Sequence, residues 1–335
     1  MAWGLALDAV RQGNRLLWSP ATADAPARAV IRAVGSGFDA DRPAAASLLE
    51  KAWAEFARAA ALSGNHARLR ALMRDGAAPY AVIGDSHSRL LVRRSRRADG
   101  AWLVPLWWLE TGASARGLGR SDARSGAGER VRAAIGRALE TDGSMPILLK
   151  FGQVDLEFVQ PFKRLEAGEQ AFDLARFKAF TDETVERYLA FLSQAIATAD
   201  RPRVHLCSLF PPTLSDAAWR TGYVNAHIAE LHGPADQESL ARRLANLTIP
   251  DLAVRTGLHA DFNSALASAA TAEGFAIADD FTPLLDAAGT VDSRYLGPPA
   301  KADHHLDFHA SRAPVVDQLW RLLEGSPENR DRHAP

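Results

Sequence analysis

A serine that could act as a nucleophile lies at position 86. The segment Gly84-Asp85-Ser86-His87-Ser88 directly follows a short apolar run, residues 80–83, and precedes Arg89-Leu90-Leu91. This order predicts a strand that turns into a helix, with Ser86 on the turn. The unpaired N–H groups and positive partial charge of a helix amino terminus can stabilise an oxyanion that forms beside the hydroxyl. The same residues could instead serve only to cap the helix.

A base for that serine could come from the other end of the chain, where Asp303, His304 and His305 precede a final helical pattern at residues 315–323. A histidine can accept the proton of a serine hydroxyl, and a neighbouring carboxylate can orient the imidazole and stabilise its charged form. We favour His305 as the base, since Leu306 follows it and could begin an anchoring turn, and Asp303 as its partner. His304 is an alternative base, and a backbone carbonyl could replace Asp303.

The elements that must position these residues are indicated from residue 79 onward, where short apolar runs alternate with longer amphipathic stretches. This alternation is typical of a parallel sheet whose strands are joined by crossover helices. The expected strands are residues 80–83, 101–106, 146–151, 203–208 and 275–277. The expected helices are residues 129–139, 174–197, 252–270 and 315–323. Active residues of such a sheet gather in the loops beyond the carboxyl ends of its strands.

The N-terminal region has a different composition. Residues 1–78 are rich in Ala and Arg, and apolar residues between positions 44 and 73 recur near the helical period. We therefore predict a helical N-terminal extension over residues 1–78, an α/β domain over 79–325 and a flexible tail over 326–335. The extension could form an oligomer, bind a protein partner or cover the active site.

The overall composition is that of a globular protein of 335 residues, with 47% hydrophobic and 24% charged residues. Lys and Arg number 39 against 40 Asp and Glu, so the net charge of -1 gives no general attraction for nucleic acid or an anionic membrane. No apolar run approaches the ~20 residues that a transmembrane helix needs. Residues 1–18 lack the pattern of a secretory signal, and the lone Cys207 cannot form an internal disulfide. We expect a cytoplasmic protein that binds neither nucleic acid nor membrane.

These segments together resemble the SGNH, or GDSL-type, hydrolases. The resemblance is carried by Gly84-Asp85-Ser86, by Gly112-Ala113-Ser114-Ala115 after the second expected strand and by the late Asp and His, and it covers residues 79–324. It implies a three-layer α/β/α sandwich with a flavodoxin-like parallel sheet of about five strands. It also implies Ser86 as the nucleophile, the backbone N–H groups of Ser86 and Gly112 as oxyanion donors, and His305 as the base.

One departure from the family concerns the oxyanion hole. The third block of the family reads Gly-x-Asn-Asp, whereas this chain has Gly152-Gln153-Val154-Asp155, so Val154 replaces an asparagine that donates to the oxyanion. Gln153 is the candidate replacement, although alternation along a strand would direct its side chain to the opposite face from Val154. Loss of one such donor costs on the order of a hundredfold to a thousandfold in rate.

The last block also departs from the family, in which Asp precedes His by three residues. Here Asp303 precedes His305 by two. Besides Gly112 and Gln153, the acids Asp85 and Asp155 of the other blocks are candidates for binding the oxyanion or the substrate.

The expected activity is hydrolysis of a small or carbohydrate O-acyl ester, such as an O-acetyl group, through an acyl-enzyme on Ser86 and without a cofactor or metal. Transfer of the acyl group to a sugar hydroxyl is an alternative, because nothing in the sequence distinguishes water from a sugar as the acceptor. A second alternative is a metallophosphoesterase that uses Asp85, His87 and the 303–309 segment as metal ligands. A third is a binding module of weak or no activity, since the oxyanion asparagine is missing.

Overall fold

The computed structural model describes residues 73–74, 76–93, 95, 97–120, 125–221, 223, 234–297 and 303–324. The expected flexible tail and nearly all of the expected N-terminal extension lie outside these residues. The first strand begins at Ala77, two residues before the expected start of the α/β domain.

Within the described residues, five parallel strands form one sheet in the order β2-β1-β3-β4-β5. The strands are β1 (Ala77–Gly84), β2 (Trp102–Leu109), β3 (Ile147–Lys150), β4 (Val204–Cys207) and β5 (Ala276–Ala278). This strand order is the flavodoxin-like one. The predicted three-layer α/β sandwich is therefore confirmed.

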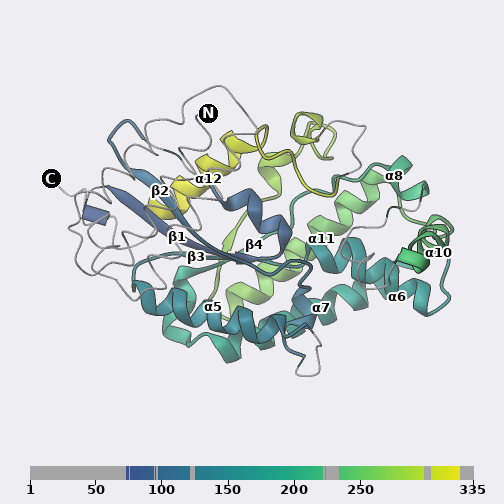
Figure 1. Cartoon of the computed structure of the whole chain (residues 1–335), viewed down its shortest axis with the longest axis horizontal. Coiled ribbons are helices and arrows are strands. Elements are labelled where there is room, and N and C mark those ends of the chain that lie inside the picture. The colour runs from purple at the N-terminus through teal and green to yellow at the C-terminus, as the bar shows by residue number, and fades with distance from the viewer. Residues whose placement is uncertain are drawn as a thin grey trace.

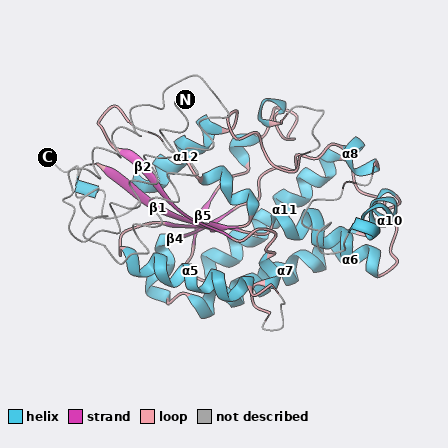
Figure 2. Cartoon of the chain, viewed as in Figure 1, coloured by secondary structure: helices cyan, strands magenta, loops and turns pink. Residues whose placement is uncertain are grey.

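Helices cover both faces of the sheet (Figures 1 and 2). One face carries α5 (Ala127–Thr141), α7 (Leu174–Ala195) and α11 (Leu252–Ala272), and the other carries α12 (Arg312–Glu324). Successive side chains of a strand point to opposite faces. Accordingly, Ala81 and Ile83 of β1 belong to the core beneath the first three helices, whereas Tyr80 and Val82 belong to the core beneath α12.

The ends of these four helices lie within three residues of the predicted ones. Two of them begin at an aspartate whose carboxylate accepts the first free N–H groups, Asp173 for α7 and Asp251 for α11. None of the helices in the described residues combines the length and apolar character that a membrane crossing would require.

A cluster of smaller helices beyond the carboxyl ends of β3 and β4 is absent from the sequence prediction. It comprises α6 (Gln160–Glu166), α8 (Asp216–Arg220) and α10 (Pro234–Ala245). Leu240, Leu244 and Leu247 form a small separate core there, against Phe162 and Leu165. The cluster stands beside the sheet on the side of its carboxyl edge (Figure 1).

Candidate active site

The turn after β1 places Ser86 at the carboxyl edge of the sheet. Gly84 packs so closely on β3 that a Cβ there would lie 2.4 Å from the carbonyl oxygen of Lys150 and 2.6 Å from the Cβ of Ser88. The next residue, Asp85, caps the short 3₁₀ helix η1 (Ser86–Leu91), because its carboxylate accepts the backbone N–H of His87 at 2.8 Å. Ser86 is the first residue of η1, so the predicted strand-to-helix turn is confirmed.

Ser86, His305 and Asp303 form one chain of hydrogen bonds. The Ser86 Oγ lies 3.0 Å from Nε2 of His305, although the two residues are 219 positions apart in the sequence. Nδ1 of the same ring lies 2.9 Å from Oδ1 of Asp303. That oxygen also accepts the backbone N–H of His305 at 3.0 Å, which fixes the ring relative to the carboxylate. The structure thus brings together the three residues expected to be nucleophile, base and orienting acid.

Asp303 is partly exposed to solvent, with 51% of its side chain accessible. The hydrogen bond from the His305 side chain is the main cause that lowers the Asp303 pKa to about 2, against an opposing effect of partial burial. The carboxylate is therefore ionised at neutral pH and can stabilise a protonated imidazole.

His304 faces a different partner from His305. Its Nδ1 lies 2.6 Å from the hydroxyl oxygen of Tyr223. Burial, followed by the neighbouring His305 and His87, lowers the His304 pKa to about 2, so the ring is neutral at neutral pH. The geometry therefore pairs Ser86 with His305 and not with His304.

The loop after β2 contains Gly112, whose φ of +70° lies in the left-handed region that favours glycine. Asp155 holds this loop, since its carboxylate accepts the backbone N–H groups of Ala115 at 2.6 Å and Arg116 at 3.2 Å. The carboxyl is fully buried, and burial raises its pKa to about 7 although the two N–H groups oppose the rise. Asp155, expected among the substrate-binding residues, instead supports the loop that carries Gly112.

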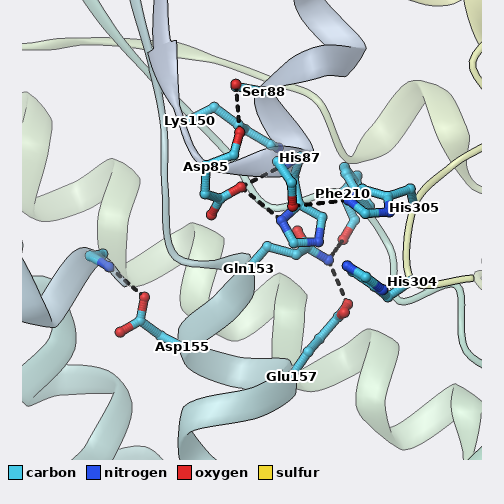
Figure 3. Close-up of polar contacts among 12 residues, drawn as sticks. Asp85, His87, Ser88, Lys150, Gln153, Asp155, Glu157, Phe210, His304 and His305 are labelled. Atoms are coloured by element: carbon cyan, nitrogen blue, oxygen red, sulfur yellow. Dashed lines mark hydrogen bonds and ion pairs between the residues drawn. The ribbon is translucent and has the colours of Figure 1, made fainter. Parts of the chain in front are cut away.

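Gln153 also differs from expectation, because its side chain is buried and points toward Glu157 and Phe210 (Figure 3). Its amide nitrogen donates to Oε1 of Glu157 at 2.6 Å and to the carbonyl oxygen of Phe210 at 3.2 Å, which uses both amide hydrogens. Strand alternation does not apply here, since β3 ends at Lys150 and Gly152 (φ +107°) turns the chain into a helix. In this conformation Gln153 does not replace the missing asparagine donor.

A second histidine–carboxylate pair lies next to Ser86. Nδ1 of His87 is 2.8 Å from Oδ1 of Asp85, and both side chains are buried. Burial raises the Asp85 pKa to about 7 and lowers the His87 pKa well below its ordinary value. Asp85 was expected to bind oxyanion or substrate, but its contacts are with His87 and the turn. The ring of His87 lies 4.8 Å, centroid to centroid, from that of His305.

Ser86, Asp303 and His305 line a cavity of about 250 Å³. Its wall combines charged and apolar side chains, including those of Arg89 and Phe308. A cavity of this size admits a small ligand or the end of a larger one.

Comparison with known proteins gives no family for this chain. No family model matches it, and no curated protein is significantly similar in sequence. A solved structure from Streptococcus pneumonia, provisionally named a platelet activating factor, matches with a TM-score of 0.40 and 16% identity. The match covers 84% of this chain and 100% of that one. A likeness at this TM-score carries no argument about activity, so the function has to be inferred from the site itself.

Proposed function

We propose that the protein is a serine esterase of the SGNH, or GDSL, type that hydrolyses a small O-acyl ester. The observation that carries this proposal is the hydrogen-bond chain in which Ser86 Oγ lies 3.0 Å from His305 Nε2, and His305 Nδ1 lies 2.9 Å from Asp303. A nucleophile, a base and an acid that orients the base are the parts that nucleophilic acyl transfer requires.

In the proposed reaction, Ser86 Oγ attacks the ester carbonyl carbon while His305 Nε2 accepts its proton. Asp303 accepts a hydrogen bond from Nδ1–H, so Nε2 is the nitrogen left unprotonated to act as the base. His305 then gives the proton to the departing alcohol, which leaves an acyl-enzyme on Ser86. A water molecule, deprotonated by His305, cleaves this ester; the carboxylic acid departs and Ser86 regains its proton.

The oxyanion of the tetrahedral intermediate would be stabilised by the backbone N–H groups of Ser86 and Gly112. The contacts of Asp155 with Ala115 and Arg116 support this assignment, because they fix the loop in which Gly112 lies. The cavity of about 250 Å³ beside Ser86 suits a substrate with a short acyl chain, such as an acetyl group. With no asparagine side chain as a further donor, we propose a modest turnover rate. A carbohydrate O-acetyl group fits this description.

The test is the initial rate of p-nitrophenyl acetate hydrolysis by the full-length wild type and by Ser86→Ala, His305→Ala and His304→Ala. The first two substitutions are expected to lower kcat/KM by about 10³-fold or more. His304→Ala is expected to lower it far less, because His304 contacts Tyr223 and not Ser86. Circular dichroism and the Tm of each variant establish that it is folded.

Two outcomes would overturn the proposal. One is a Ser86→Ala variant that retains the wild-type rate. The other is a folded wild type that hydrolyses no ester of a short acyl chain.

A further inference from the structure

Three imidazoles converge beside Ser86. One ring nitrogen each from His87, His304 and His305 lies within 4.8 Å of the other two, and Figure 3 shows the three rings grouped together. The ring centroids of His304 and His305 are 3.9 Å apart, and those of His87 and His304 are 5.3 Å apart. The proposed esterase uses only His305, so the presence of the other two rings needs a separate explanation.

Each of the three rings has its Nδ1 paired with a side-chain oxygen. The pairs are His87 with Asp85 at 2.8 Å, His304 with Tyr223 at 2.6 Å and His305 with Asp303 at 2.9 Å. Histidines that bind a metal usually hydrogen-bond their other ring nitrogen in this way, which fixes the tautomer and directs the free nitrogen to the ion. The pairing leaves the three Nε2 atoms as the ligands.

His87 provides an independent indication that something else binds here. The residue is 1% exposed, and its Nε2 has no hydrogen-bond partner in the described part of the chain. A buried polar atom without a partner is costly, so such an atom is rare unless it serves a ligand. The Asp85 contact fixes the ring with this nitrogen toward the other two histidines (Figure 3).

We propose that Zn²⁺ binds the Nε2 atoms of His87, His304 and His305 and thereby inhibits the esterase. Three neutral imidazoles suit zinc and do not suit Mg²⁺ or Ca²⁺, which prefer oxygen ligands. Zn–N bonds of about 2.0 Å in tetrahedral geometry place the nitrogens roughly 3.3 Å apart, so the rings must draw together when the ion binds. A water molecule or the Ser86 oxygen would complete the coordination.

The inhibition follows from the single lone pair on His305 Nε2. This lone pair either accepts the proton of Ser86, 3.0 Å away, or binds the metal, and it cannot do both. The binding site stands on the histidine geometry alone, whereas the inhibitory effect rests on the proposed esterase function.

Zinc binding is tested first, by isothermal titration of metal-free full-length protein with Zn²⁺ and by the visible spectrum of the Co²⁺ form. Wild type and Ser86→Ala are expected to bind one equivalent with four-coordinate spectra. His87→Ala and His304→Ala are expected to weaken binding by about 10²-fold or more, and Tyr223→Phe by about tenfold. The matched control is His309→Ala, which removes a histidine of the same loop outside the cluster. Zinc binding that survives in both His87→Ala and His304→Ala would overturn the site.

Inhibition is tested second, as the ratio of p-nitrophenyl acetate rates with and without one equivalent of Zn²⁺, so that differences in basal rate cancel. The wild-type rate is expected to fall at least tenfold and to recover with a chelator, whereas the ratio stays near one in His87→Ala. A wild type that binds zinc without loss of rate, or a Ser86→Ala variant that zinc activates, would overturn the inhibitory role. A wild type without esterase activity would contradict the proposed function, while the titration would still decide the metal site.

Discussion

Asp303 orients His305 through two hydrogen bonds to the same carboxylate oxygen, one from the backbone N–H and one from Nδ1. Because half of the Asp303 side chain is exposed, solvent screens its charge, and its electrostatic effect on the imidazole is smaller than in a buried triad. Its main contribution is to hold one tautomer and one ring orientation. Replacement of the carboxylate by an amide removes the control of the tautomer and preserves the shape of the side chain.

At this scale, Asp303→Asn is expected to lower kcat for p-nitrophenyl acetate by about 10²-fold, because an amide can donate to Nδ1 and favour the wrong tautomer. KM should change little, since the amide preserves the size and shape of the side chain that lines the cavity. Asp307→Asn is the matched control: Asp307 accepts the backbone N–H groups of His309 and Ala310 and does not contact His305. Equal kcat values for the two variants would contradict an orienting role.

The spacing Asp-x-His recurs in the sequence, and the copies at residues 85–87 and 303–305 have the same local geometry. In each, one oxygen of the aspartate accepts the backbone N–H of the histidine and pairs with its Nδ1. The spacing indicates both pairs as candidates, but it also occurs at residues 307–309, where Asp307 accepts the backbone N–H of His309. The choice between His304 and His305 could not be predicted, because it depends on Tyr223, a residue from a distant segment that occupies the Nδ1 of His304.

Among the elements, the loop after β2 and the helical turn after β3 depend on each other. The turn begins where Gly152 directs the chain out of β3, and η3 (Asp155–Val159) then places the Asp155 carboxylate under the N–H groups of Ala115 and Arg116. Asp155 is thus a positioning residue for Gly112. Short apolar runs in the sequence predict the strands, but they cannot predict this contact between segments 40 positions apart.

Asp155→Asn tests this dependence, because the amide retains one acceptor oxygen and faces the second N–H with a donor. The free energy of unfolding is expected to fall by about 1–3 kcal/mol and kcat to fall about tenfold, with KM nearly constant. Asp173→Asn is the matched control, since Asp173 also accepts two backbone N–H groups, at the start of α7 and away from the site. A loss of stability in Asp155→Asn without any loss of kcat would show that the loop does not serve catalysis.

At the scale of the whole molecule, several ionisable side chains are buried near the carboxyl edge of the sheet, among them Asp85, Asp155 and Glu157. Burial raises the pKa of Glu157 to about 8 and those of Asp85 and Asp155 to about 7. The Glu157 carboxyl lies under the small helical cluster, hydrogen-bonded to Gln153. Two helices of that cluster, α6 with seven residues and α8 with five, are too short to be predicted, and the apolar residues of the cluster form a separate small core. Short elements carry too few residues for a period to be distinct.

The raised carboxyl pKa values make stability depend on pH. A folded-state pKa above the unfolded one contributes stability below the unfolded pKa, and this is lost as pH rises through the folded pKa. Buried histidines with lowered pKa, such as His87 and His259, act in the opposite direction, but only below about pH 6.5, where the unfolded histidines become protonated. Of these two effects, only that of the carboxyl groups therefore changes the free energy of unfolding between pH 6.5 and 8.

We accordingly expect the free energy of unfolding in urea to fall between pH 6.5 and pH 8. Glu157→Gln should reduce this fall by about 1–2 kcal/mol, because one proton is no longer released by the folded state. Glu166→Gln, at an exposed position on α6, should leave the fall unchanged. A Glu157→Gln variant with the wild-type pH dependence would contradict a neutral buried carboxyl.

The most direct test of the central claim is the site at which a fluorophosphonate forms a covalent adduct, mapped by peptide mass spectrometry on the folded full-length protein. The account predicts one adduct, on Ser86, which is absent in Ser86→Ala, greatly slowed in His305→Ala and retained in Ser88→Ala. Ser88 is the matched serine, because its hydroxyl is buried and bonded to the carbonyl oxygen of Asp85 and to Trp107. An unmodified wild type, or an adduct on any other residue, would contradict Ser86 as the nucleophile.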